Sequence, residues 1–288
     1  MDMIAVTGAA GKTGLAVVRA LSEKGQSVRA LVRREEQARA VRRVAPDATV
    51  LLGDLREPGS LASLLQESRA VYHICPNVHP DEVALGQGLL AAVQQTEIRH
   101  VVFHSVLHPQ AEAMPHHWRK LRVEEMLLEC GRPWTSLQPA PYMQNILVHR
   151  QRIVDQGNFT VPYALTARLS QVDLEDVAKV AARVLTEEGH VGAAYALCGP
   201  EILDANAMAT ELGRVLGRDV TAEAVSMETW RKTAQQAGLD EERCETLAAM
   251  FRYYDRFGLM GNPNVLGWLL GRPPTSFKEF VERDFCPQ

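Results

Sequence analysis

A glycine-rich turn directly after the first strand constrains this chain more than any other feature. The apolar run Met3–Thr7 is followed by Gly8, Gly11 and Gly14 at three-residue spacing, and an amphipathic stretch then begins. This order predicts a strand, a tight turn and a helix, in which the glycines let the backbone come close to a phosphate. The helix N-terminus adds unpaired N–H groups and the positive end of its dipole. The sequence therefore predicts a dinucleotide-binding turn, with contacts from Gly8, Ala10, Gly11, Lys12, Thr13 and Gly14.

Two other interpretations of this turn are a nucleotide-triphosphate loop and a turn without a ligand. Gly11-Lys12-Thr13 matches the end of the motif G-x-x-x-x-G-K-T, which requires glycine at position 6, where this chain has Val6. The spacing therefore excludes the first interpretation. The place of the glycines, between a strand and a helix, favours the dinucleotide over the empty turn.

The first half of the chain alternates apolar strand-like runs with helical stretches. Strands are expected at Ile4–Thr7, Ser27–Arg33, Thr49–Leu52, Ala70–Ile74, His100–Ser105 and Trp134–Gln138, and helices at Leu15–Glu23, Glu35–Val44, Gly59–Gln66, Glu82–Gln95 and Trp118–Cys130. Near-continuous apolar strands joined by helices predict a parallel sheet covered on both faces. The predicted fold class is therefore α/β, a doubly wound (Rossmann) sheet with ligands at the carboxyl ends of its strands.

The second half predicts a smaller C-terminal α+β lobe. Its expected elements are helices at Tyr142–Gln156, Asp173–Thr186, Asn206–Leu216, Met227–Ala237 and Glu241–Phe257, and strands at Phe159–Pro162 and Ala194–Leu197. No Pro-, Gly- or Ser-rich linker separates the two halves. We therefore expect an NAD(P)-binding domain over residues 1–150 and a substrate-binding lobe over residues 151–288 that is partly interleaved with it.

Composition narrows the class of protein and of partner. A hydrophobic content of 46% and a charged content of 23% are ordinary for a globular protein. The net charge of -4 gives no basis for binding nucleic acid or an anionic membrane directly. No apolar run approaches the roughly 18 residues of a membrane span, and no secretion signal precedes the first strand. The five cysteines contain no C-x-x-C pair, so we expect reduced thiols and a cytoplasmic protein.

The loops after the second to fourth strands carry the expected remainder of the cofactor site. Arg33, followed by Arg34, favours the 2′-phosphate of NADP by charge and fork geometry, although Glu35 directly after this pair and a solvated role of the pair at a helix start leave NAD open. In Gly53-Asp54-Leu55, the carboxylate of Asp54 is placed to accept from the adenine amino group and Leu55 to cover the ring, unless Asp54 caps the next helix. The Cys75-Pro76 turn lies where the cofactor ribose would pass.

The loop after the fifth strand and the helix that follows carry the candidate reaction centre. His104 and Ser105 end the strand, and Lys120 opens the helix, so the serine and lysine are placed to flank a nicotinamide. The four histidines between 104 and 117 suggest a metal site, but they lack both the H-E-x-x-H and the H-x-H pattern and an acidic ligand at suitable spacing, so we expect no metal. No G-x-S-x-G elbow surrounds Ser105, which excludes a serine hydrolase.

Taken together, these segments resemble the NmrA-like family of atypical short-chain dehydrogenases/reductases. The resemblance covers the whole chain and extends to His116-x-x-x-Lys120, Pro139-Ala-Pro-Tyr142-Met-Gln-Asn145, Val172-Asp173-Leu-Glu-Asp176-Val and the ending Gly271-Arg-Pro-Pro-Thr-Ser-Phe277. It implies an NAD(P)-binding Rossmann fold. Some members are NADPH-dependent quinone or enone reductases, whereas others bind NADP as redox-sensing regulators without turnover.

One departure from the wider superfamily bears on chemistry. Most short-chain dehydrogenases carry Tyr-x-x-x-Lys, and this chain has His116 in the place of the tyrosine. Reduction of an isolated ketone needs a placed proton donor, whereas the product anion of a quinone is delocalised and water can protonate it. The resemblance then implies that Lys120 contacts the nicotinamide ribose and that Ser105 or His116 lies near the acceptor oxygen. It also implies that Pro139 contacts the cofactor. The residues it implies at the substrate are His104, Tyr142 and Asn145, of which Tyr142 also contacts the cofactor. His116 facing solvent at a helix start is the alternative.

The leading hypothesis is therefore an NADPH-dependent reductase of a quinone-like or conjugated aromatic carbonyl, with NADP as cofactor and NAD as the alternative. The first alternative function is a non-catalytic NADP sensor that acts on a protein partner. The second is a tailoring or oxygenase-linked component of secondary metabolism. The expected partner is a small aromatic or quinone molecule, without direct contact to nucleic acid or membrane, and a homodimer stays open.

Overall fold

A seven-stranded sheet with strand order β3-β2-β1-β4-β5-β6-β9 dominates the computed structural model, which describes residues 3–286. The pairs among the first six strands are all parallel. Their order places β1 in the middle, so the chain winds outward first to one edge and then to the other. The strands are β1 Met3–Val6, β2 Val28–Val32, β3 Thr49–Leu52, β4 Ser68–His73, β5 His100–His104, β6 Trp134–Pro139 and β9 Ala193–Leu197.

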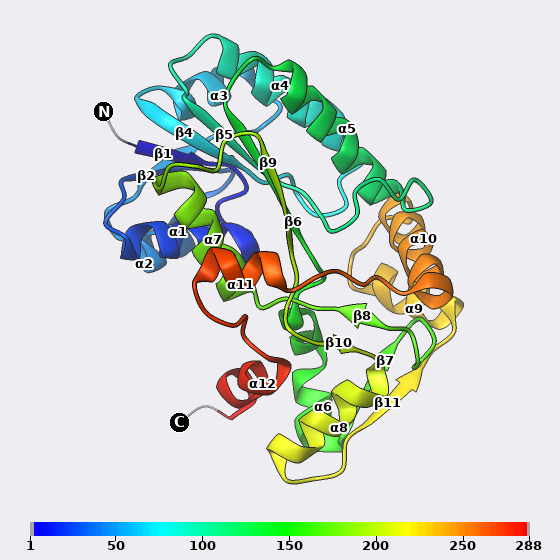
Figure 1. The fold of residues 1–288 in the computed structure, drawn as a ribbon. Coiled ribbons are helices and arrows are strands. Elements are labelled where there is room, and N and C mark those ends of the chain that lie inside the picture. The colour runs from blue at the N-terminus through cyan, green and yellow to red at the C-terminus, as the bar shows by residue number, and fades with distance from the viewer. Residues whose placement is uncertain (1–2, 287–288) are drawn as a thin grey trace. The chain divides into compact units, whose positions relative to one another are not determined.

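Helices cover both faces of this sheet. Figure 1 shows α3, α4 and α5 on one side of the strands and α1, α2 and α7 on the other. The bounds are α1 Lys12–Glu23, α2 Glu35–Val44, α3 Pro58–Leu65, α4 Glu82–Gln94, α5 Pro115–Glu129 and α7 Leu174–Thr186. The apolar face of the first group packs on alternate strand residues such as Val71, Val101 and Phe103, which are fully buried. The predicted doubly wound α/β fold is confirmed.

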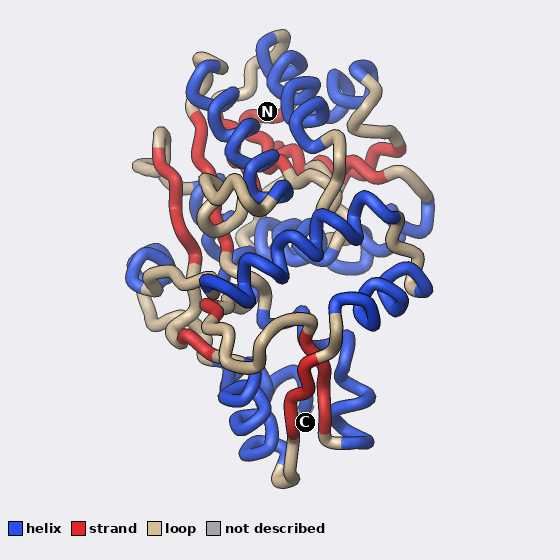
Figure 2. The backbone as a smooth tube through the Cα atoms, turned by 90° about the vertical axis from the view of Figure 1, so that its right-hand side faces the viewer, coloured by secondary structure: helices blue, strands red, loops and turns tan. Residues whose placement is uncertain are grey.

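A second group of elements has a core of its own. Its helical elements are the 3-10 helix η1 Met143–His149, α6 Arg150–Gln156, α8 Ala205–Leu216, α9 Met227–Gln236, α10 Glu241–Phe257, α11 Asn264–Leu270 and α12 Phe277–Phe285. Its strands β7 Asn158–Val161 and β11 Thr221–Ala224 pair in parallel, and β8 Leu169–Ser170 and β10 Ile202–Leu203 pair antiparallel. Figure 2 shows the β7–β11 pair in red among blue helices. Phe159, Phe277 and Phe280 are buried at the centre of this core.

The sequence misses several short elements of this group. The single helix expected over 142–156 is a 3-10 helix followed by a short α-helix. Helices α11 and α12 and strands β8, β10 and β11 were not expected. Two-residue strands carry no periodicity to detect, and α12 is recognised by its cap rather than by its apolar pattern: Ser276 and Glu279 form a reciprocal capping box.

The chain divides into two compact units that are discontinuous in sequence. The first comprises the chain up to Gln110, His117–Gln138 and Val177–Tyr195, and the second comprises Ala111–His116, Pro139–Asp176 and the chain from Ala196 onward. The functional division at residue 150 into a cofactor domain and a substrate lobe stays a prediction. Within residues 3–286, no helix combines the length and the apolar character needed to cross a bilayer.

Close packing between α4 and α5 depends on one glycine. A Cβ built on Gly86 of α4 would lie 2.8 Å from Cγ2 of Val123 on α5, closer than real Cβ atoms approach a neighbour. Gly86 lies one turn after Glu82, and Val123 lies one turn after Lys120. Residues one turn apart share a helix face, so this contact brings the beginnings of the two helices together.

We predict opposite effects for the same substitution at two positions of α4. Gly88→Ala raises the free energy of unfolding by about 0.5–1 kcal/mol, because alanine favours the helix and its Cβ meets only Leu61 Cδ1 at 4.0 Å. Gly86→Ala lowers it by about 1–2 kcal/mol, because the overlap with Val123 outweighs that gain. Urea titrations of the two variants measure the difference. An equal gain at both positions would contradict the close contact of α4 with α5.

Candidate functional site

The glycine turn has the geometry of a phosphate cradle. Gly8 adopts φ +57°, and a Cβ there would lie 2.8 Å from the carbonyl oxygen of Ile74. Cβ atoms at Gly11 and Gly14 would crowd the carbonyl oxygen of Gly8. Gly11 is also the N-cap of α1, and within residues 3–286 no side chain caps that end of the helix. Ala10 lies in the turn, and Lys12 and Thr13 begin α1, so the six predicted residues are contiguous at the start of the helix; their contact with a pyrophosphate stays a prediction.

The carboxyl end of β3 carries a charged fork that the sequence did not single out. Arg33, just after β2, is exposed, and its positive charge is one of the influences that lower the pKa of Asp54. The dominant influence is Arg56, whose Nε and terminal nitrogen donate to the Asp54 carboxylate at 3.0 and 2.7 Å and hold its pKa at about 2. Arg56 thereby adds a second cation to the region where a 2′-phosphate is expected. The roles of Arg33, Asp54 and the half-buried Leu55 at the adenosine stay predictions.

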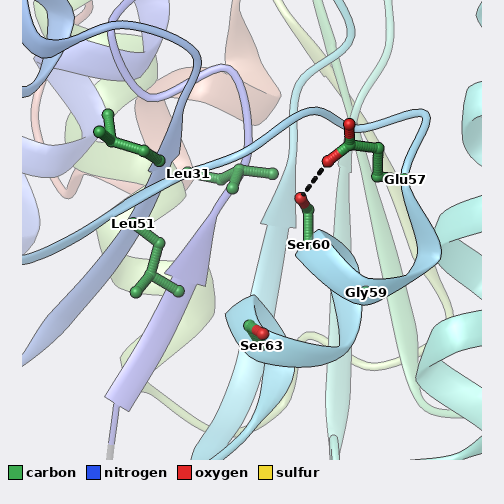
Figure 3. A pocket seen from close by; sticks show the side chains of 7 residues that line it. Leu31, Leu51, Glu57, Gly59, Ser60 and Ser63 are labelled. Carbon is green, nitrogen blue, oxygen red and sulfur yellow. Dashed lines mark hydrogen bonds between the residues drawn. The ribbon is translucent and has the colours of Figure 1, made fainter.

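A pocket lies between β2, β3 and α3. It has a volume of about 420 Å³ and is lined by Leu31, Leu51, Leu52, Glu57, Gly59, Ser60 and Ser63. Figure 3 shows Ser60 pointing to Glu57, to which its hydroxyl donates at 2.9 Å. The same hydroxyl accepts from the backbone N–H of Asp54 at 3.2 Å. None of the predicted site residues lines this pocket, so we do not assign the reaction to it.

The end of β5 holds a serine whose side chain is buried. The backbone N–H of Ser105 donates to the carbonyl of Leu137 at 2.8 Å, which anchors the residue beside β6. Its side chain is fully buried, and its hydroxyl has no hydrogen-bond partner within residues 3–286. An unpaired buried hydroxyl costs free energy, and a bound ligand is one way to recover it. This observation fits the predicted place of Ser105 beside a nicotinamide.

Lys120 is part of a buried ion pair that the sequence did not reveal. Its Nζ lies 2.7 Å from Oε1 of Glu82, the first residue of α4, and both side chains are buried. The same ammonium donates to the backbone carbonyl of His104 at 2.8 Å and lies 5.0 Å from the ring centroid of Phe103. The carboxylate of Glu82 therefore compensates the positive charge of Lys120, and Lys120 holds the end of β5 through the His104 carbonyl. Contact of Lys120 with the nicotinamide ribose stays a prediction.

Cys75 closes this buried group from the side of β4. Its thiol is buried two residues after the strand. Burial raises the pKa of Cys75, and the negative charge of Glu82 raises it further. The thiol therefore stays protonated and acts as a small apolar wall beside the ion pair, with Pro76 following it. A contact of these two residues with the cofactor stays a prediction.

Several histidines near the carboxyl ends of β4 and β5 are buried as neutral imidazoles. Burial, reinforced by the charge of Lys120, lowers the pKa of His73 and of His104 to about 3. Burial also lowers the pKa of His117 to about 4. His116 is 5% exposed in the first turn of α5, so the alternative in which it faces solvent is wrong. A role of His116 near an acceptor oxygen stays a prediction.

The remaining predicted residues belong to the second unit. Pro139 is buried at the end of β6, and Tyr142 precedes η1 and forms an isolated bridge with Val172. Asn145 is exposed, and its backbone N–H donates to the carbonyl of Tyr142 at 3.0 Å. This unit also holds His116, whereas the cradle, Arg33, Asp54, Cys75, Ser105 and Lys120 are all in the first unit.

Comparisons with known proteins agree along the whole chain. The sequence profile described as the NmrA-like family matches residues 1–281. The chain is 30% identical over 281 residues to an NAD(P)H azoreductase of Xenophilus azovorans, with 97% of each protein covered. It is 26% identical over 285 residues to quinone oxidoreductase 2 of Escherichia coli (strain K12), covering 98% of this chain and 99% of the other. The crystal structure of an NADPH-dependent quinone oxidoreductase from Escherichia coli complexed with NADPH matches with a TM-score of 0.85 at 25% identity, covering 99% of this chain and 100% of that one.

We predict strong coupling between Glu82 and Lys120 in stability. Glu82→Gln and Lys120→Met each lower the free energy of unfolding by about 3–5 kcal/mol, because each leaves an unpaired charge in the interior. The double variant loses much less, because neither charge is then present. Urea titrations of all four proteins give the coupling energy, and single losses that simply add up in the double variant would contradict the buried pair. The affinity of the double variant for NADPH shows whether Lys120 also contacts the cofactor.

We also predict that stability falls on acidification from pH 6.5. The pKa values of His73, His104 and His117 in the folded protein lie below the usual 6.5, so between pH 6.5 and about 3–4 the unfolded chain binds more protons than the folded one. Each of these histidines then removes up to about 1.4 kcal/mol of stability per pH unit as the pH decreases. Denaturant titrations at pH 7, 6, 5 and 4.5 measure the slope. His73→Leu should flatten it, and a stability unchanged from pH 7 to pH 5 would refute the assignment of buried neutral histidines.

Proposed function

This chain belongs to the NmrA-like family, and from that premise we propose that it is an NADPH-dependent reductase of a quinone-like or conjugated aromatic acceptor. The observation that carries the proposal is the cradle of Gly8, Gly11 and Gly14 at the uncapped start of α1. Side chains at these positions would collide with the protein's own carbonyl oxygens, so only glycines allow the tight turn that a bound pyrophosphate requires. An azoreductase and a quinone oxidoreductase that use NAD(P)H and match nearly the whole chain support the same conclusion.

The choice of NADPH over NADH rests on charge. Arg33 and Arg56 place two guanidinium groups around the end of β3. Guanidinium groups bind a 2′-phosphate through charge-assisted hydrogen bonds, for which NADH offers no counterpart. The Escherichia coli relative was crystallised with NADPH, in agreement with this choice. NAD stays the alternative cofactor.

The choice of acceptor rests on what the site lacks. Bound NADPH supplies a hydride, which reduces the acceptor by two electrons, and a proton then completes the product. The helix position four residues before Lys120 is a histidine, where most short-chain dehydrogenases have an acidic tyrosine. A delocalised anion such as a hydroquinone anion takes its proton from water, so an acceptor of this class tolerates the loss of the tyrosine. Ser105 contributes a buried hydroxyl beside the predicted nicotinamide position.

The decisive experiment is NADPH oxidation against a panel of quinones, azo compounds, enones and simple ketones. We expect turnover with the first three classes and little with simple ketones. Arg33→Ala should raise the Kd for NADPH about tenfold, the equivalent of one charge-assisted hydrogen bond, and leave the Kd for NADH unchanged. Arg19→Ala, on α1, is the matched control for removal of a positive charge.

The outcomes separate the alternatives. Equal affinity of the wild type for NADPH and NADH would refute the NADP assignment. Tight NADPH binding without turnover of any acceptor would refute the reductase and favour a non-catalytic cofactor sensor.

A further inference from the structure

A tyrosine and a histidine from neighbouring strands are joined at the carboxyl end of the sheet. The hydroxyl of Tyr72 on β4 lies 2.7 Å from Nδ1 of His104 on β5. Tyr72 pairs with Val102 in the register of the two strands, so Tyr72 and His104 lie on the same face of the sheet. Tyr72 is fully buried and His104 is 8% exposed. The phenol is therefore inaccessible to solvent, and the imidazole is the more exposed member of the pair.

The backbone of His104 is held independently of its ring. Lys120 donates to the carbonyl oxygen of His104, and Ser105 follows at once with its N–H bonded to Leu137. The end of β5 is thus fixed by α5 on one side and by β6 on the other. The ring has the Tyr72 hydroxyl at Nδ1, so the orientation of the imidazole is determined by both its backbone and its side chain.

The chemistry of the pair favours one proton arrangement. A phenolic O–H is a stronger acid than the N–H of a neutral imidazole, and an imidazole nitrogen is a stronger base than a phenolic oxygen. The tyrosine therefore donates to Nδ1, which leaves the proton of the imidazole on Nε2. Burial keeps the ring neutral, because it lowers the pKa of His104 to about 3. A neutral imidazole with a fixed tautomer is a hydrogen-bond donor of constant geometry across the physiological pH range.

We propose that Tyr72 is a positioning residue that holds His104 as a neutral Nε2–H donor to the carbonyl oxygen of the acceptor; this inference rests on the proposed function. In a quinone, the hydride supplied by NADPH would form an O–H bond at the carbonyl oxygen remote from His104, and the π electrons would shift through the ring onto the carbonyl oxygen that His104 contacts. His104 stabilises the resulting anion by a hydrogen bond and keeps its own proton. Water supplies the proton that completes the hydroquinone, and NADP⁺ remains. The dyad thus takes over the stabilising part of the absent tyrosine's role without its proton transfer.

Two conservative substitutions of His104 separate donation from mere packing. The amide nitrogen of glutamine takes the place of Nε2, whereas that of asparagine takes the place of Nδ1 beside Tyr72. We expect His104→Asn to lower kcat with a quinone about a hundredfold, the scale of a lost oxyanion donor, and His104→Gln to retain kcat within about tenfold of wild type. The Kd for NADPH should stay unchanged in both variants. Equal kcat in the two variants, or better activity of the asparagine variant, would overturn the donor role.

The role of Tyr72 is read from the ring itself. In ¹⁵N spectra of the imidazoles, we expect wild-type His104 to carry its proton on Nε2, and Tyr72→Phe to populate both tautomers and lower kcat about tenfold. Tyr195→Phe is the matched control, because Tyr195 also bonds a histidine, His190 Nδ1 at 3.1 Å, but on the peripheral strand β9. Its kcat should equal that of wild type. A wild-type proton on Nδ1, or a tautomer unchanged in Tyr72→Phe, would overturn the assignment.

Failure of the proposed function gives a different result. A wild type that binds NADPH but reduces no acceptor refutes the reductase and with it the donor role of His104. The tautomer measurement needs no turnover and still decides whether Tyr72 fixes the ring.

Discussion

The contact between the ammonium of Lys120 and the carboxylate of Glu82 organises the carboxyl end of the sheet. Each charge alone would be unfavourable in an interior lined by Phe103 and the helix side chains, so the two are stable there only together. The pair requires α4 and α5 to approach closely, and that approach requires the missing side chain at Gly86. Through the His104 carbonyl, the same lysine fixes the strand that ends at Ser105. Helix packing, electrostatics and the position of the candidate reaction centre therefore depend on one another.

The parts of the site that depend on local chemistry were predictable from the sequence. The role of a glycine turn between a strand and a helix, or of an arginine after the second strand, follows from its neighbours in the sequence. A few residues therefore predict the glycine turn and the fold class. The roles of Glu82 and Tyr72 do not follow from their neighbours in the sequence. Glu82 has the sequence signature of an acid at a helix start, favoured by the dipole, and its burial depends on a helix more than thirty residues later. Tyr72 has the signature of an apolar strand residue, and its partner lies on the neighbouring strand.

Among the described residues at the carboxyl ends of β4 and β5, the buried ionisable groups are either paired or uncharged. Lys120 is neutralised by Glu82, the buried histidines are uncharged, and the Cys75 thiol stays protonated. This environment agrees with the proposed acceptor, an apolar molecule whose negative charge develops only during reduction. Near the end of β3, where the adenosine is expected, Arg56 is paired with Asp54 and Arg33 is exposed. The two ends of the expected cofactor are thus distinguished by polarity.

The glycine at position 86 has a consequence for how the substrate range of such a protein changes in evolution or in the laboratory. A side chain there would widen the gap between α4 and α5, and the displacement would reach the candidate reaction centre through Glu82 and Lys120. Substitutions in the contact between helices α4 and α5 are therefore expected to occur in both helices together. Replacing only one helix with that of a homologue in which the two helices are farther apart would leave Glu82 or Lys120 without its ionic partner. Replacing both helices would keep the ion pair complete.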